Sequence, residues 1–210
     1  MTKGIRVNGD LFTIMISERR IKARVKELAR QISKDCTGTV PVFIGILNGS
    51  FIFFADLIRE ITVDCEIDFL KLSSYGDAKI SSGNVQLLKG LNCQVEGRDI
   101  VIVEDIVDSG LSMDYIRNLI MRQNPRSFRI VTLLYKKDSV KTGIHVDYVG
   151  FSIPRDFVIG YGLDYAQRER NLRAPTTCYS RRMADRIAAP NRAVMKVAAP
   201  KTSTGSVPAE

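Results

Sequence analysis

The first half of the chain alternates between helical and extended patterns of apolar residues. Ser17 suits the N-cap of a helix, and the apolar residues that follow fall on one helical face: Ile21, Val25, Leu28, Ala29 and Ile32. Residues 41–47 form a continuous apolar run, which is typical of a strand buried on both faces. After a break at residues 48–50, the pattern predicts a helix over 51–61 and a strand over 65–72.

The second half continues this alternation and sets the fold class. The pattern predicts a helix over 115–121 and strands over 85–88, 99–103, 128–135, 147–151 and 157–161. Strands that alternate with helices favour an α/β fold, in which helices flank a mostly parallel, twisted sheet. Residues 73–84 are polar and small, and loops of that length inside compact domains are often lids over a site.

Composition changes after Arg173, where Ala, Pro, Thr and Ser dominate. We therefore expect one folded domain over residues 1–173 and a disordered basic tail over residues 174–210. The tail has six Lys or Arg against two acids, which is +4 of the net charge of +8. The remaining +4 is unremarkable for the body of the chain, so charge gives weak support for nucleic-acid binding.

The cellular location is predicted from what the sequence lacks. Its apolar runs are too short and too interrupted to span a membrane. The N-terminus has no apolar segment typical of a secretion signal. The cysteines are widely spaced, without a CxxC pair, which indicates reduced thiols in the cytosol: Cys36, Cys65, Cys93 and Cys178. We expect a cytoplasmic protein.

The residues with the clearest chemistry follow the most apolar strand, over residues 100–103. Glu104 and Asp105 come directly after it, at the edge of the sheet where ligands of α/β proteins bind. Two adjacent carboxylates are costly to bury unless they bind a metal ion or accept hydrogen bonds. A ribose diol offers two such donors, and Mg²⁺ would add a counter-charge.

A phosphate site is predicted immediately afterwards, over residues 108–112. Gly110 allows a tight turn, and backbone N–H groups and two hydroxyls then converge at the start of a helix. Residues 100–112 could therefore hold a ribose 5-phosphate. A Walker B strand is excluded because no G-x-x-x-x-G-K-[ST] loop is present. A plain buried strand followed by a capped helix stays open on spacing alone.

Residues 103–112, Val-Glu-Asp-Ile-Val-Asp-Ser-Gly-Leu-Ser, resemble the signature of the type I phosphoribosyltransferases. Further segments match the hypoxanthine-guanine phosphoribosyltransferases in order and spacing, and they lie at residues 45–51, 72–76, 134–136 and 156–165. This resemblance covers roughly residues 10 to 173. It implies a parallel-sheet core with a small hood subdomain. It also implies transfer of the 5-phosphoribosyl group from phosphoribosyl pyrophosphate to hypoxanthine or guanine, giving IMP or GMP and pyrophosphate with Mg²⁺.

The resemblance assigns residues to phosphoribosyl pyrophosphate. Glu104 and Asp105 would bind the ribose hydroxyls and magnesium, and Arg170 would contact the pyrophosphate. The 5-phosphate would lie on Ser109, Gly110, Leu111 and Ser112. The pyrophosphate loop, which often has a cis peptide in the family, would be Leu47, Asn48 and Gly49. Ser74 and Tyr75 match the lid that excludes water during the reaction.

The resemblance also assigns the purine site. Asp108 would face N7 of the purine and manage its proton. Lys136 would read the 6-oxo group, which predicts poor use of adenine because an ammonium only donates. Phe157 would stack on the base, Val158 would contact its edge, and Asp164 would bind a second magnesium. Taken singly, Lys136 could be a solvated strand end, Asp164 a turn cap and Arg170 a charge on a solvated helix.

Two departures from the family leave other functions open. Asn48 stands where many relatives have lysine, which removes one cationic contact with pyrophosphate. Residues 174–180 do not resemble the strand that completes the hood in relatives. A folded but inactive protein, or a nucleic-acid-binding regulator with a basic tail, therefore stays an alternative. The partners we expect are the two small substrates and further copies of the chain, as a homodimer or homotetramer.

Overall fold

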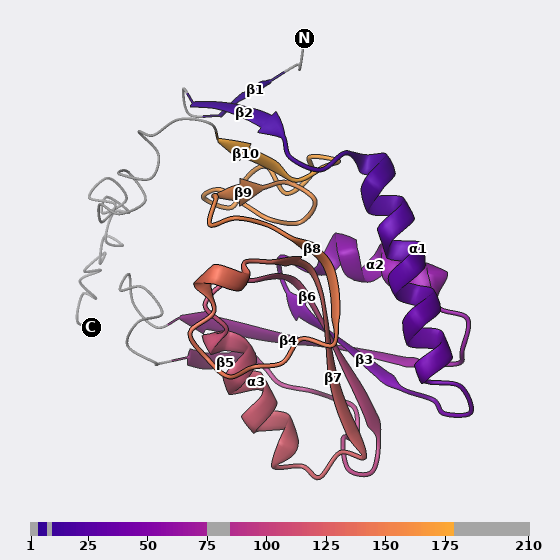
Figure 1. Ribbon diagram of the computed structural model, residues 1–210. Helices are drawn as coiled ribbons and strands as arrows, with labels where there is room; N and C mark the ends of the chain where they lie inside the picture. The colour runs from indigo at the N-terminus through magenta and orange to yellow at the C-terminus, as the bar shows by residue number, and fades with distance from the viewer. Residues whose placement is uncertain (1–3, 8–9, 75–84, 179–210) are drawn as a thin grey trace, which may run out of the picture.

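The computed structural model describes residues 4–7, 10–74 and 85–178. Its core is a sheet of six strands in the order β5-β4-β3-β6-β7-β8 (Figure 1). Neighbouring strands are parallel except for the antiparallel pair β4 and β5. The strands span Val42–Leu47 (β3), Glu66–Ser74 (β4), Val85–Lys89 (β5), Asp99–Val107 (β6), Ser127–Tyr135 (β7) and Tyr148–Ser152 (β8).

Helices cover both faces of this sheet, which confirms the predicted α/β fold. α1 (Glu18–Asp35) and α2 (Phe51–Glu60) share one buried cluster with the sheet, while α3 (Leu111–Met121) belongs to a second cluster. In Figure 1, α1 and α2 lie on one side of the strands and α3 on the other. Among the residues described, no helix combines the length and the apolar character needed to cross a membrane.

A small antiparallel sheet forms the hood above the core (Figure 1). Its strand order is β1-β2-β10-β9. The strands span Ile5–Val7 (β1), Asp10–Ile14 (β2), Val158–Ile159 (β9) and Thr176–Cys178 (β10). Because β2 pairs with β10, the hood joins the start of the described chain to its end, across more than 160 residues.

In the core, a short 3₁₀ helix, η2 (Lys137–Ser139), follows β7.

The last hood strand is present, although residues 174–180 do not resemble the corresponding strand of relatives. β10 lies between β2 and β9, with Thr176 opposite Ile14 on one side and opposite Ile159 on the other. Ala174 and Thr176 are buried, so the first residues of the predicted tail belong to the hood. The β-branched residues Thr176 and Thr177 suit a strand. The sequence analysis nevertheless predicted neither this strand nor β2, the strand with which it pairs. Residues 179–210 lie outside the described residues, so the predicted disorder stays a prediction there.

Two element boundaries differ from those predicted near the phosphate segment. β6 does not end at Val103 but continues to Val107, because its ladder with β7 extends to Val107 opposite Tyr135. Glu104 and Asp105 consequently lie within the strand rather than after it. α3 begins at Leu111, directly after Gly110, instead of at residue 115.

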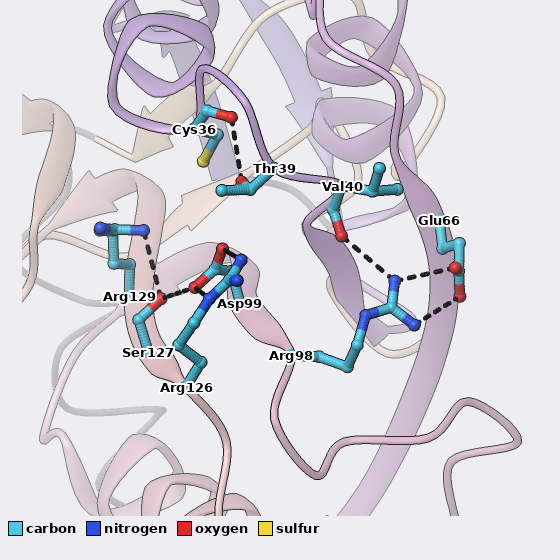
Figure 2. A network of polar contacts seen from close by, with 9 residues as sticks. All are labelled: Cys36, Thr39, Val40, Glu66, Arg98, Asp99, Arg126, Ser127 and Arg129. Carbon is cyan, nitrogen blue, oxygen red and sulfur yellow. Dashed lines mark hydrogen bonds and ion pairs between the residues drawn. The ribbon is translucent and has the colours of Figure 1, made fainter.

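A polar network links the amino ends of several strands of the core sheet (Figure 2). Asp99 at the start of β6 accepts hydrogen bonds from Arg126 Nε at 2.9 Å, from Arg126 Nη2, and from Ser127 Oγ at 2.7 Å. Arg98 donates to Glu66 Oε1 at 2.8 Å and to the carbonyl of Val40 at 3.1 Å. These hydrogen bonds pair the charged side chains at the amino ends of the strands. None of the predicted site residues that the structure describes takes part in this network.

Asp99 gives this network a predictable pH dependence. Hydrogen bonds from Arg126 hold the pKa of Asp99 well below its usual range. Because its pKa is lowered on folding, ionised Asp99 stabilises the fold at pH values above the pKa of Asp in the unfolded chain, which is about 3.9. This contribution is lost as the pH falls from there towards the pKa of Asp99 in the folded chain. We expect Asp99→Asn to lower the free energy of unfolding by about 2 kcal/mol at pH 7. Urea unfolding from pH 7 to pH 3 measures this difference.

The control is Asp64→Asn, which removes the same charge from an exposed residue. We expect it to change the free energy of unfolding by less than about 0.5 kcal/mol at every pH. The difference in free energy of unfolding between Asp99→Asn and the original chain should narrow below about pH 4, because the Asp99 carboxyl of the unfolded chain then becomes protonated while that of the folded chain stays ionised. A gap that stays constant across this range would contradict the assigned role of the Asp99 carboxylate.

Candidate active site

The candidate site lies at the switch point of the core sheet. From β3 the chain runs through α2 to β4 on one side, and β6 joins β3 on its other side. Such a reversal opens a crevice beyond the carboxyl ends of the two strands. A cavity of about 320 Å³ lies here, between the core and the hood, and it is lined by Asn48, Gly49, Asp105, Ile106, Asp108, Lys136, Phe157, Val158, Leu163, Asp164 and Arg170.

Most of the predicted site residues meet in this cavity although they come from segments that are far apart in sequence. Ile106 and Leu163 also line it, and the sequence reasoning did not find them. Leu47, Glu104 and residues 109–112 adjoin the lining segments without lining the cavity themselves. Ser74 ends β4, and Tyr75 lies outside the described residues, so the lid assignment stays a prediction.

The loop after β3 has the backbone feature expected from the resemblance. The peptide bond between Leu47 and Asn48 is cis. Gly49 lies so close to Asp105 that an added methyl group would be 1.8 Å from Asp105 Oδ2. Only glycine lets the loop lie against this carboxylate without displacement, because any side chain would overlap it.

The carboxylates of Glu104 and Asp105 are both buried, with 7% of each residue exposed. The amide of Ile106 donates to Asp105 Oδ1 at 2.8 Å, and the amide of Asp105 donates to Glu104 Oε1 at 3.1 Å. Burial raises the pKa of both groups, and the neighbouring Asp105 charge raises the pKa of Glu104 further. A bound cation or hydroxyl donors would offset this cost of burying charge.

Lys136 and Asp108 form an ion pair inside the cavity. Lys136 Nζ lies 2.8 Å from Asp108 Oδ2, and the lysine side chain is only 10% exposed, against 54% for the aspartate. The Lys136 amide also donates to the carbonyl of Val107 at 3.0 Å, which fixes the end of β7 against β6. Lys136 is therefore not a solvated strand end. The pair places a group that only donates beside a carboxylate that accepts.

The hood supplies the apolar wall of the cavity. Phe157 packs its ring edge-on against Tyr165, with ring centroids 5.6 Å apart and an interplanar angle of 77°. Thr177 Oγ1 in β10 donates to the carbonyl of Phe157 at 3.1 Å. Val158 is buried at the start of β9. β10, which the sequence did not reveal as a strand, thus holds the wall on which a planar base could stack.

Asp164 and Arg170 face each other across a turn beside this wall. Arg170 Nη2 lies 2.7 Å from Asp164 Oδ1, and the amide of Gln167 donates to Asp164 Oδ2 at 2.8 Å. Asp164 therefore does cap a turn, as the simpler interpretation held, while it also lines the cavity. Arg170 is not on a helix, and its side chain is 20% exposed.

The segment after Asp108 has the geometry of an anion site. Gly110 has φ of +82°, a left-handed conformation that glycine adopts easily, and it caps α3. The start of a helix favours negative charge, because its first backbone N–H groups point outward with the positive end of the helix dipole. The amide of Lys141 donates to the carbonyl of Ser109 at 2.9 Å and fixes this loop from behind.

Comparison with models of protein families shows the family to which this chain belongs. The model of the phosphoribosyl transferase domain matches residues 15–166, which is more than half of the chain. The chain is a member of the phosphoribosyl transferase family. The hood strand β10, which begins at Thr176, lies beyond the segment matched by this phosphoribosyl transferase domain.

Individual phosphoribosyltransferases are similar over most of this chain. The hypoxanthine-guanine phosphoribosyltransferase of Bacillus subtilis is 47% identical over 163 residues, which cover 78% of this chain and 91% of the relative. The hypoxanthine phosphoribosyltransferase of Escherichia coli is 46% identical, over 76% of this chain and 90% of the relative. A hypoxanthine-guanine phosphoribosyltransferase structure from Bacillus anthracis superposes with a TM-score of 0.76 at 41% identity, covering 78% of this chain and 96% of that one.

Proposed function

We propose that the chain is a purine-salvage enzyme of the hypoxanthine-guanine type. It transfers the 5-phosphoribosyl group from phosphoribosyl pyrophosphate to hypoxanthine or guanine and releases IMP or GMP with pyrophosphate. The observation that carries this proposal is the pairing of Lys136 with Asp108 beside Phe157, at the switch point of a phosphoribosyltransferase core. Named relatives between 46% and 47% identical support the same activity, and none of these comparisons supports a nucleic-acid-binding regulator.

The purine is recognised by groups from the core and the hood. Lys136 donates a hydrogen bond to the 6-oxo oxygen, and a 6-amino group in that place would face a second donor. Phe157 stacks on the ring, and Val158 contacts its edge. Asp108 accepts the proton that N7 loses while N9 forms its bond to C1′ of the ribose. Purine binding therefore exchanges the ion pair of Lys136 and Asp108 for contacts with the base.

Phosphoribosyl pyrophosphate lies across the other side of the cavity. Residues 109–112 hold its 5-phosphate, Glu104 and Asp105 accept hydrogen bonds from its ribose hydroxyls, and Arg170 and the loop of Asn48 and Gly49 hold its pyrophosphate. Asn48 contributes no charge, so its backbone supplies the contact. The lid that includes Ser74 and Tyr75 excludes water, which would otherwise attack the sugar as pyrophosphate leaves C1′.

Magnesium fits the carboxylates of this cavity. Among the described residues no group of three or more His, Cys, Asp or Glu side chains could hold a metal ion. One or two carboxylates together with substrate phosphates are a common environment for Mg²⁺, so Glu104 and Asp105 would hold one ion and Asp164 a second. When bound, magnesium neutralises the charge that develops on the departing pyrophosphate.

The proposal extends to the assembly and the location of the enzyme. We place it in the cytoplasm as a homodimer or homotetramer. The widely spaced cysteines, which include no CxxC pair, support a reducing compartment. Light scattering during size-exclusion chromatography measures the assembly directly.

The experiment that tests this function is an absorbance assay with hypoxanthine, guanine, xanthine and adenine side by side, each with phosphoribosyl pyrophosphate and Mg²⁺. We expect turnover of hypoxanthine or guanine with kcat/KM at least about 10⁴-fold above that for adenine, because adenine leaves the buried ammonium of Lys136 unpaired. Comparable turnover of adenine would contradict the role of Lys136. Absence of turnover with all four bases would contradict the proposed function.

A further inference from the structure

Tyr161 is a buried residue of the hood with an uncommon backbone. It stands between Gly160 and Gly162, and the three residues have φ of +89°, +52° and +102°. Glycine adopts such angles freely, whereas a tyrosine there is disfavoured. Tyr161 is only 5% exposed. Contacts elsewhere in the fold must therefore hold this backbone in place.

The strongest such contact reaches α2 in the core. Tyr161 Oη donates a hydrogen bond to Asp56 Oδ2 at 2.6 Å, and the Tyr161 amide donates to the carbonyl of Leu172 at 2.7 Å. Asp56 also pairs with Arg59 one turn further along α2. Burial and the Asp56 charge raise the pKa of Tyr161, so its hydroxyl stays a donor at all working pH values.

The neighbouring residue Gly162 connects this contact to the candidate active site. Arg170 Nη1 donates to the carbonyl of Gly162 at 2.8 Å, while the Gly162 amide donates to the carbonyl of Arg170 at 2.9 Å. Gly162 also lies against the loop after β3, since an added methyl group would be 2.0 Å from the carbonyl oxygen of Gly49. One residue thus contacts both elements proposed to hold pyrophosphate.

We propose that Tyr161 is a positioning residue for pyrophosphate: its hydrogen bond to Asp56 fixes Gly162 against the Gly49 carbonyl and the Arg170 side chain. The inference rests on the proposed function, because it takes Gly49 and Arg170 as the pyrophosphate contacts. It adds a specific consequence. Loss of the Tyr161 hydroxyl should weaken the binding of phosphoribosyl pyrophosphate and of pyrophosphate. The affinity for hypoxanthine, which binds at Lys136 and Phe157, should stay the same.

The chain offers a matched control for this hydroxyl. Tyr148 Oη donates to Asp35 Oδ2 at 2.7 Å, and Tyr148 is 8% exposed. Tyr148 begins β8 and Asp35 ends α1, and neither lines the cavity of the candidate site. Tyr161→Phe and Tyr148→Phe therefore each remove one buried tyrosine hydroxyl bonded to an aspartate, and only the first is adjacent to Gly162.

Initial rates in both directions test the proposal. For Tyr161→Phe we expect KM for phosphoribosyl pyrophosphate, and KM for pyrophosphate in the reverse reaction, to rise about tenfold, as for loss of one hydrogen bond to a charged group. KM for hypoxanthine should change less than about twofold, within the scatter of a site away from the change. Tyr148→Phe should leave all three constants unchanged. Thermal unfolding of both variants shows whether their losses of stability are similar.

Two changes at Asp56 test the partner of the hydroxyl. Asp56→Asn keeps an oxygen that can accept from Tyr161, and we expect it to retain most of the affinity for phosphoribosyl pyrophosphate. Asp56→Leu cannot accept, and it should reproduce the effect of Tyr161→Phe. These variants also keep the test valid if Tyr161→Phe folds poorly.

The outcomes separate this inference from the proposed function. Equal rises of KM in Tyr161→Phe and Tyr148→Phe would reduce Tyr161 to a general stabilising residue and overturn the inference. An unchanged KM for phosphoribosyl pyrophosphate in Tyr161→Phe would overturn it as well, while the proposed function stands if the original chain forms IMP. An original chain that forms no IMP contradicts both.

Discussion

Asp108→Asn is expected to lower kcat for IMP formation by about 10²-fold to 10⁴-fold, the usual contribution of a general base. Asparagine keeps an oxygen that can accept from Lys136, so the local structure should persist, but it cannot take a proton from N7. KM for phosphoribosyl pyrophosphate should change little, because Asp108 faces the base. Steady-state kinetics with saturating hypoxanthine measures the loss.

The control for this change is Asp138→Asn. Asp138 is exposed in η2 and does not line the cavity, yet the change removes the same charge. Its kcat should stay within about twofold of the original chain, as for surface changes in general. Turnover of Asp108→Asn close to that of Asp138→Asn would remove Asp108 from the mechanism.

Lys136→Gln is expected to reduce both the rate and the selectivity for 6-oxopurines. Removing one charged donor from a buried site should lower kcat/KM for hypoxanthine by about 10²-fold to 10³-fold. The glutamine amide can donate or accept, so the penalty against a 6-amino group should fall as well. The ratio of kcat/KM for hypoxanthine to that for adenine should therefore drop by at least about tenfold.

Lys137→Gln provides the comparison, since Lys137 is the next residue and its side chain is exposed. It removes the same charge without a place in the cavity. We expect its selectivity for hypoxanthine to equal that of the original chain. Selectivity that survives in Lys136→Gln would mean that another group reads the 6-position of the base.

The core of the fold was predictable because its signals are local. The face of α1 with Ile21, Val25 and Leu28 is buried as its helical spacing predicts. β3 and residues 100–103 of β6 are continuous apolar runs, and the structure buries them between helices on both faces. In such elements the spacing of apolar residues along the sequence matches the spacing of buried positions in the fold. Few other secondary structures would bury the same residues.

The hood was harder to predict because its strands are short and its central pairing joins segments that are remote in sequence. β10 has three residues, and its neighbour β2 lies near the opposite end of the described chain. Three-residue strands show too little alternation to be distinguished from loops. Pro175 and the Ala-rich sequence that follows gave residues 174–180 the composition of an unstructured tail. In the fold, β10 pairs with a strand on each side and lies in the middle of the hood sheet.

The candidate site divides in the same way. Asp108, Lys136 and Phe157 could be proposed from sequence because they lie in segments that match the phosphoribosyltransferases in order and spacing. Ile106 and Leu163 could not, since an apolar residue in an apolar segment has no distinguishing signal. Tyr161 belongs to a matched segment, yet its bond to Asp56 spans 105 residues and appears only in the fold.

The central claim is that the cavity between β3, β6 and the hood holds both substrates in the proposed order. A crystal structure of the enzyme with IMP, pyrophosphate and Mg²⁺ tests it most directly. We predict the base on Phe157 with its 6-oxo oxygen at Lys136 Nζ, the 5-phosphate on residues 109–112, and pyrophosphate between Gly49 and Arg170. A nucleotide bound elsewhere, or one whose base points away from Lys136, would contradict the account.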